Sequence, residues 1–161
     1  AAGSFAQQPD SPDYVRLQPG DEAPPLAGFD IFNETFFSED LLGEKLLLVD
    51  FFGTDCAPCI AEFPEVRNLY KLYPDDLEVV MVNTGPDSRE VLKRFQMKHY
   101  LTDFRIIRDK YAKIGPLFGV DAVPVTILIG KDGKILHAEY SSFNDGELLE
   151  TLLPIIEAHL E

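Results

Sequence analysis

Tryptophan is absent from this chain of 161 residues, and cysteine occurs only twice, as Cys56 and Cys59. A disulfide between residues so close in sequence closes a very short loop and adds little to the stability of a fold. A zinc site needs about four ligands, and no second cysteine pair or closely spaced histidine pair accompanies these two. The pair therefore points to redox chemistry rather than to a disulfide framework, and neither a metal nor another cofactor is expected.

Positive charge is also scarce, because 14 lysines and arginines stand against 28 aspartates and glutamates. The net charge of −14 repels nucleic-acid phosphates and anionic lipid headgroups, so neither is an expected partner. No apolar run reaches the roughly 20 residues that span a bilayer. The chain starts at Ala1 rather than at Met, and its opening AAGSFAQQ fits either the remainder of a removed signal or anchor, or a cloning remnant.

The remaining sequence predicts one domain behind a tail. Residues 1–19 are polar and lack any period, which indicates a flexible tail, and residues 20–161 suffice for a single domain. The dense apolar run at 46–52 predicts a central strand buried on both faces. Further strands are predicted at 26–30, 35–37, 77–82, 104–107, 123–129 and 135–140. Helices are predicted from the cysteine pair to about 73, at 89–99, at 110–118 with a break at its Gly-Pro pair, and at 147–160.

Several local details accompany this outline. Ser38, Ser88 and either Asn144 or Asp145 are predicted helix N-caps. The inner side of the helix at 89–99 is predicted to carry Val91, Leu92, Phe95 and Met97. Strands that alternate with helices and end in a hairpin and a helix predict an α/β fold with a mixed sheet.

The cysteine pair follows the central strand and opens a helix, which is a favourable place for a thiolate. Only the thiolate attacks disulfides efficiently, and the unpaired N–H groups of a helix N-terminus stabilise negative charge. Cys56 is therefore the predicted exposed nucleophile. Cys59 lies one helical turn deeper and is the predicted resolving thiol. Pro58 suits the first helical turn, where no N–H donor is needed.

The segment VDFFGTDCAPC, residues 49–59, resembles the active-site strand and helix of thioredoxins. Its continuation IAEFP is similar to the exported thioredoxin-like reductases of the TlpA/ResA type. AVPVTI at 122–127 and KDG at 131–133 resemble the proline loop and hairpin of that family. The resemblance covers residues 20–160. It implies a three-layer α/β/α fold with an N-terminal hairpin and a central insertion at 87–108.

The resemblance also implies roles for individual residues. Pro124 would be a cis-proline that faces the sulfurs, and the backbone of Val123 would pair with an extended substrate segment. Asp50 takes the place of a buried acid, whose pKa burial should raise so that it can accept the proton of Cys59. An Asp50 that is solvated or hydrogen-bonded at a strand end is an equally weighted alternative. Glu62 would tune the thiols, with a merely exposed helical position as its alternative.

Two departures from the family pattern concern the reactivity of the cysteines. Asp55 stands where related proteins carry tryptophan, so a carboxylate adjoins Cys56 and disfavours its thiolate. Ala57-Pro58 replaces the Gly-Pro of thioredoxin between the cysteines.

His137 lies in the last strand and invites comparison with copper-delivering proteins of this fold, although their Cys-x-x-x-Cys spacing is absent.

The leading hypothesis is a periplasmic or otherwise extracytoplasmic thiol–disulfide oxidoreductase that reduces protein disulfides, with cytochrome c maturation as the process implied. Its partners would be protein thiols and disulfides and a membrane electron donor or acceptor thiol protein. The full-length form would carry the membrane anchor, since no membrane span is predicted in these residues. A general oxidase or isomerase, a copper-binding module and a redox-inactive interaction protein are the alternatives.

Overall fold

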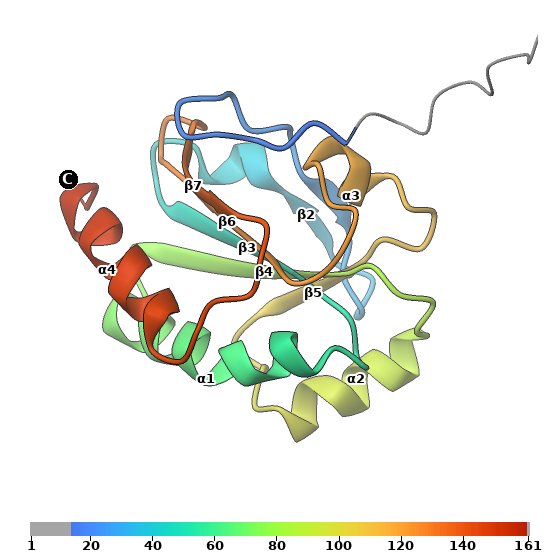
Figure 1. The fold of residues 1–161 in the computed structure, drawn as a ribbon. Coiled ribbons are helices and arrows are strands. Elements are labelled where there is room, and N and C mark those ends of the chain that lie inside the picture. Colours follow the sequence, from blue (N-terminus) through green and yellow to red (C-terminus); the bar gives the residue numbers. More distant parts are fainter. Residues whose placement is uncertain (1–13, 161) are drawn as a thin grey trace, which may run out of the picture.

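The computed structural model describes residues 14–160 as a five-stranded sheet with helices on both faces (Figure 1). The sheet has the order β5-β4-β3-β6-β7, with β3, β4 and β5 parallel and β6 antiparallel to both neighbours. The strands are β1 (Ala27–Phe29), β2 (Thr35–Phe37), β3 (Leu46–Phe52), β4 (Leu77–Asn83), β5 (Arg105–Arg108), β6 (Val125–Ile129) and β7 (Ile135–Glu139). The helices are η1 (Ser38–Leu41), α1 (Ala57–Leu72), α2 (Arg89–Lys98), α3 (Ile114–Leu117) and α4 (Glu147–Ala158).

This arrangement is the predicted three-layer α/β/α fold, with the hairpin β1–β2 and the inserted α2 and β5. Helices α1, α2 and α4 cover one face of the sheet, and α3 and the hairpin cover the other (Figure 1). Of the helices within residues 14–160, none has both the length and the apolar character that a bilayer crossing requires. Residues 1–13, most of the predicted tail, lie outside the described residues.

Strand β3 is the centre of both hydrophobic layers, since all seven of its residues are buried. Alternate side chains of a strand point to opposite faces of its sheet. Leu46, Leu48 and Phe52 pack with residues of α1, α2 and α4, and the intervening residues pack with the hairpin and the end of α3. The predicted central strand is therefore confirmed, and its even-numbered positions face α1.

Two predicted N-caps are wrong. Ser38 is itself the first residue of η1, and its hydroxyl accepts a hydrogen bond from the N–H of Leu26 at 2.8 Å instead of capping the helix. Helix α4 is capped by Gly146 in the left-handed conformation (φ +81°) rather than by Asn144 or Asp145. The carboxylate of Glu147 instead accepts the N–H of Asn144 at 2.9 Å. The prediction for Ser88 is confirmed, since its hydroxyl accepts the N–H of Val91.

Two helix details also differ from the predictions. Met97 is 68% exposed, and Gln96 is buried in its place and donates to the carbonyl of Phe104 at 3.1 Å. Met97 follows Phe95 by two residues, which places it on the other side of the helix. The helix predicted at 110–118 is only the four-residue α3, which contains the Gly-Pro pair instead of breaking there.

The described end of the predicted tail, residues 14–19, lies against the domain. The N–H of Leu17 donates to the hydroxyl of Tyr140, which donates in turn to the carbonyl of Phe118. Gly119 has a φ of +72°, and a Cβ placed on it would lie 2.4 Å from the carbonyl oxygen of Val15. Glycine at this position therefore permits the close approach of the N-terminal segment.

Replacing Gly119 with alanine should weaken this contact. Gly119→Ala is expected to lower the free energy of unfolding by about 2–3 kcal/mol, because it adds a steric clash to the cost of a left-handed alanine. Gly43→Ala is the matched control, since Gly43 has a φ of +78° and nothing within 4 Å of its Cβ position. The control should lose only about 1 kcal/mol in urea denaturation. Equal losses in the two variants would contradict the role given to the contact with Val15.

Candidate functional site

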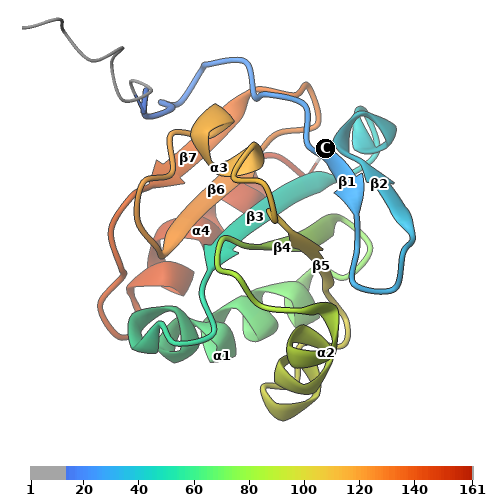
Figure 2. The same cartoon turned by 90° about the vertical axis from the view of Figure 1, so that its right-hand side faces the viewer.

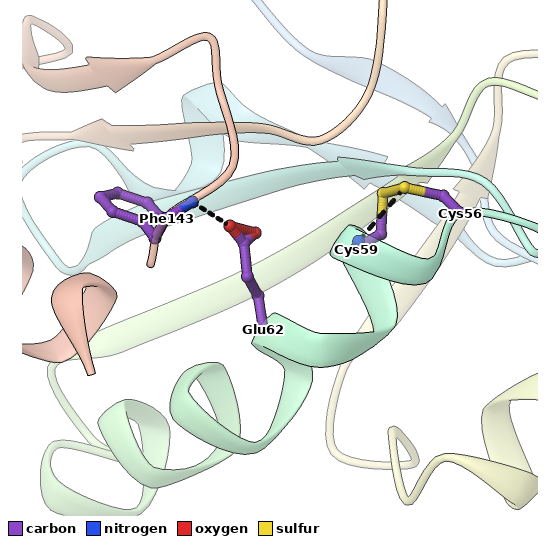
Figure 3. The surroundings of a disulfide bond; sticks show 4 residues. All are labelled: Cys56, Cys59, Glu62 and Phe143. Atoms are coloured by element: carbon purple, nitrogen blue, oxygen red, sulfur yellow. Dashed lines mark hydrogen bonds between the residues drawn. A yellow bond between two sulfur atoms is a disulfide. The ribbon is translucent and has the colours of Figure 1, made fainter. Parts of the chain in front are cut away.

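The cysteine pair occupies the turn between β3 and α1. The N–H of Cys56 donates to the carbonyl of Gly53 at 3.3 Å and closes the turn. Cys56 is the N-cap of α1, and its Sγ accepts the N–H of Cys59 at 3.2 Å. The two cysteines form a disulfide (Figure 3). Cys56 is half-buried and Cys59 is 1% exposed, so the N-terminal cysteine is the accessible one, while Pro58 lies exposed in the first turn of α1.

The proline loop lies beside this turn. The peptide bond between Val123 and Pro124 is cis, the geometry that the resemblance implied. A Cβ placed on Gly53 would lie 3.8 Å from Cβ of Cys56 and 3.9 Å from Cγ2 of Val123. Pro124 is buried and Val123 is half-buried. The structure therefore brings the loop before β6 and the cysteine turn together at the Cα of Gly53.

Asp50 is the polar residue on the α1 side of β3, between the apolar side chains of Leu48 and Phe52. It pairs with Thr126 on β6 and with Met81 on β4, and it is 3% exposed. Burial raises the pKa of Asp50 well above its usual value of 3.8, and the negative charge of Glu62 raises it further. The alternative of a solvated strand-end aspartate is therefore wrong.

Glu62 lies one turn after Cys59 on the same side of α1, and both side chains point toward the sheet (Figure 3). It is 4% exposed, and its carboxylate accepts the N–H of Phe143 at 2.8 Å. Burial raises the pKa of Glu62 from 4.5 to about 7, with a further contribution from Glu65, and the hydrogen bond from Phe143 opposes the rise. Glu62 is thus a buried titrating group, not an exposed helical residue.

Asp50 and Glu62 together place two carboxyl groups with raised pKa values beneath the helical face that carries Cys59. The two groups are connected, since the charge of Glu62 contributes to the raised pKa of Asp50. Groups of this kind can accept or release a proton near neutral pH, which exchange between thiols and disulfides requires.

Asp55 and His137 lie at the edges of the site. Asp55 is exposed, and its Oδ1 would lie 3.3 Å from a Cβ on Gly53, the glycine that Cys56 also adjoins. His137 pairs with Glu139 at 3.2 Å and stacks on Phe143 with ring centroids 6.4 Å apart. Within residues 14–160, no three histidine, cysteine, aspartate or glutamate side chains are grouped so that they could hold a metal ion.

A hydrogen-bond network that no sequence motif indicates holds the cysteine turn in place. The hydroxyl of Thr54 donates to the carboxylate of Asp87, with both oxygens 3.0 Å away. Asn83 donates to the same carboxylate at 3.1 Å, and Nε of Arg108 donates to the backbone carbonyl of Asp87 at 3.0 Å. Thr54 and Asp87 are 33 residues apart, so only the pairing of β3, β4 and β5 brings the network together.

Comparisons with known proteins agree with this geometry. The sequence profile of the Redoxin family matches residues 18–153. The thiol-disulfide oxidoreductase ResA of Bacillus cereus is 32% identical over 126 residues, which cover 78% of this chain and 71% of that protein. ResA of Bacillus subtilis is 32% identical over 121 residues, covering 74% and 66%. The thioredoxin domain of a Bacteroides vulgatus thiol-disulfide oxidoreductase, 22% identical, superposes with a TM-score of 0.74 over 87% of this chain and 99% of that chain, which shows the shared fold.

The raised pKa of Glu62 should make the stability of the protein depend on pH. Between pH 4.5 and about 7 the unfolded chain has already lost the proton that folded Glu62 keeps, so the free energy of unfolding falls as pH rises through this interval. Glu62→Gln keeps an acceptor for the N–H of Phe143 and removes this loss. The free energy of unfolding of the variant should equal that of the wild type near pH 4.5 and exceed it by about 2–3 kcal/mol near pH 8.

Urea denaturation of the oxidised proteins at both pH values measures the difference. Asp50 also lowers the free energy of unfolding as pH rises, so part of the dependence of this free energy on pH should remain in Glu62→Gln. Glu65→Gln is the matched control, because Glu65 lies on the same helix and also accepts a backbone N–H. The control should keep most of the wild-type slope. An unchanged slope in Glu62→Gln would contradict the assignment.

Proposed function

The chain belongs to the Redoxin family and, within it, to the thiol-disulfide oxidoreductases related to ResA, and on this premise we propose that it reduces protein disulfides outside the cytoplasm. The observation that carries the proposal is the Cys56–Cys59 disulfide at the N-terminus of α1, beside the cis-proline loop. An accessible sulfur at a helix N-terminus with a buried partner one turn deeper is the arrangement that disulfide exchange requires.

In the proposed reaction the dithiol form of the protein is the electron donor. The Cys56 thiolate attacks one sulfur of the substrate disulfide, and the other substrate sulfur leaves as a thiolate. The Cys59 thiolate then attacks Sγ of Cys56 and releases the second substrate sulfur. Two electrons pass to the substrate, and the protein is left with the Cys56–Cys59 disulfide. In the disulfide form the N–H of Cys59 donates to Sγ of Cys56, and in the dithiol form the same N–H is placed to stabilise the Cys56 thiolate.

Asp50 and Glu62 are proposed to take up the proton that Cys59 must lose before it attacks. Both are buried on the α1 side of the sheet, and burial raises the pKa of each, to about 7 for Glu62, so both carboxyls bind a proton more readily than they would in water. Because these carboxyls hardly contact solvent, a proton from Cys59 can be kept within the site and returned in the reverse reaction.

The proline loop is proposed to position the substrate. Val123 is half-buried beside the cysteine turn, and its backbone can pair with an extended substrate segment, as in strand addition to a sheet. Pro124 would hold this backbone in place. The protein would be returned to the dithiol form by a membrane electron-donor thiol protein, and cytochrome c maturation is the process proposed for it. The relatives named ResA support this setting, and a membrane anchor in the full-length form is proposed with it.

Trapping of the mixed disulfide tests the roles of the two cysteines. Cys59→Ser, reduced and mixed with a protein disulfide, should accumulate a covalent adduct through Cys56, because the sulfur that resolves it is missing. Cys56→Ser should form no adduct, since the remaining sulfur is buried. Non-reducing electrophoresis with mass spectrometry detects the adduct. Accumulation in Cys56→Ser but not in Cys59→Ser would reverse the assignment.

Asp55 is proposed to slow the attack of Cys56. Removing its charge in Asp55→Asn should raise the alkylation rate of the reduced protein near pH 7 by about two- to threefold, a modest effect because Asp55 is exposed. The rate is measured with iodoacetamide, and the difference should shrink as salt is added. Asp145→Asn, an exposed charge before α4, is the control and should leave the rate unchanged. A rate for Asp55→Asn equal to that of the wild type would refute the proposal.

A further inference from the structure

We propose that a cationic groove beside the redox turn docks a carboxylate-rich segment of the protein partner. The groove lies between the hairpin β1–β2 and the segment that joins β5 to α3, and both flank the same face of the sheet (Figure 2). Its volume is about 390 Å³, within the range of sites that hold small ligands or a few side chains. The inference deepens the proposed function, on which it rests, by naming the class of partner.

The groove gathers positive charge on a chain that is otherwise strongly acidic. Its lining includes Arg89, Arg108, Lys110 and Lys113, four of the 14 lysines and arginines. Both lysines are exposed, and both arginines are half-buried. Within residues 14–160, no hydrogen bond uses the terminal nitrogens of Arg108, whose Nε is bound to the carbonyl of Asp87. The guanidinium therefore keeps the paired donors that suit a carboxylate.

The two acidic residues of the lining are already engaged. Asp30 forms an ion pair with Arg105 at 2.7 Å and accepts the N–H groups of Phe32 and Glu34. Asp109 accepts three backbone N–H groups at the start of α3, at 2.8–3.0 Å. These aspartates are 6% and 7% exposed, so the charge that a ligand meets in the groove is that of the four cations.

The groove reaches the same edge of the sheet as the cysteine turn. In the parallel strands, Phe52 pairs with Asn83, and Asn83 pairs with Arg108. Arg108 thus lies two strand spacings, about 10 Å, from the residue that leads into the turn. An extended peptide covers this distance with about three residues. The network of Arg108, Asp87 and Thr54 also ties the groove wall to the turn.

Charge complementarity identifies the occupant as an acidic peptide segment. The rest of the chain repels such a segment, so the groove is a local exception that fixes where and in which orientation it approaches. Two exposed aromatic side chains, Phe29 (64%) and Tyr111 (73%), line the same groove and offer apolar contact to a peptide. The occupant is therefore a run of aspartate or glutamate about three to six residues from the substrate cysteine.

Peptides with matched charge test this inference. Each peptide carries one cysteine as a mixed disulfide with a chromogenic thiol, followed after four residues by four glutamates, four glutamines or four lysines. The reduced protein should turn over the glutamate peptide about tenfold faster in kcat/KM than the glutamine peptide, and the lysine peptide should be slowest. Added salt should reduce the preference, because exposed ion pairs are screened. Equal rates for the three peptides would overturn the inference.

Charge-reversal variants test which lysines cause the preference for the glutamate peptide. Lys110→Glu with Lys113→Glu should bring the ratio of glutamate to glutamine rates to one or below. Lys131→Glu with Lys134→Glu is the matched control, since these lysines have the same spacing and lie in the turn between β6 and β7, outside the groove. The control variant should keep the wild-type ratio of the glutamate-peptide rate to the glutamine-peptide rate. If both double variants lost the preference equally, net charge would be its cause, and the proposed docking in the groove would be wrong.

Two further outcomes complete the test. If sedimentation shows that the wild type dimerises at low salt through Lys110 and Lys113, or if vesicles with anionic headgroups bind there and the glutamate peptide does not compete, the occupant is not an acidic peptide and the inference fails. Failure to reduce any of the three peptides would instead count against the proposed reductase function. The two proposals are therefore tested separately.

Discussion

The site depends on the complete burial of β3, which fixes both the register of the sheet and the place where α1 begins. Seven consecutive residues are buried, and side chains of alternating direction fill the two hydrophobic layers. A shift of one residue would turn Asp50 to the hairpin side and would bring Val49 beneath α1. The free-energy cost of such a register shift explains why β3 ends at Phe52 and why the turn that carries Cys56 begins at this edge of the sheet.

The same constraint explains what could be predicted from the sequence. A run such as Leu46–Phe52 shows its burial directly in its composition, and Cys56, Cys59, Asp50 and Glu62 could be located because they stand at fixed distances from it. The prediction of Ser88 as a cap also held, since its hydroxyl acts on a neighbour three residues away. Features determined within one turn of chain are accessible to reasoning about patterns.

Features determined by long-range contacts were missed or wrong. Ser38 has the composition of a cap, but its hydroxyl is taken by Leu26, which only the folded hairpin brings near. The bond between Thr54 and Asp87 likewise needs the register of three strands. No local pattern encodes such pairs, because each partner satisfies ordinary rules at its own position.

The distribution of charge connects the buried and the exposed parts of the site. Asp50 and Glu62 are buried beneath α1, and burial raises the pKa of both, so this region resists the accumulation of negative charge. A thiolate on Cys59 would add another negative charge to the same space. This region therefore favours states in which Cys59 or a carboxyl keeps the proton, which agrees with the proton transfer proposed for the reaction. On the outer surface the sign of the charge is opposite, since Arg108 and its cationic neighbours line the groove proposed for an acidic partner. The two charges are kept apart because the buried acids lie on the α1 face of the sheet and the groove lies on the hairpin side.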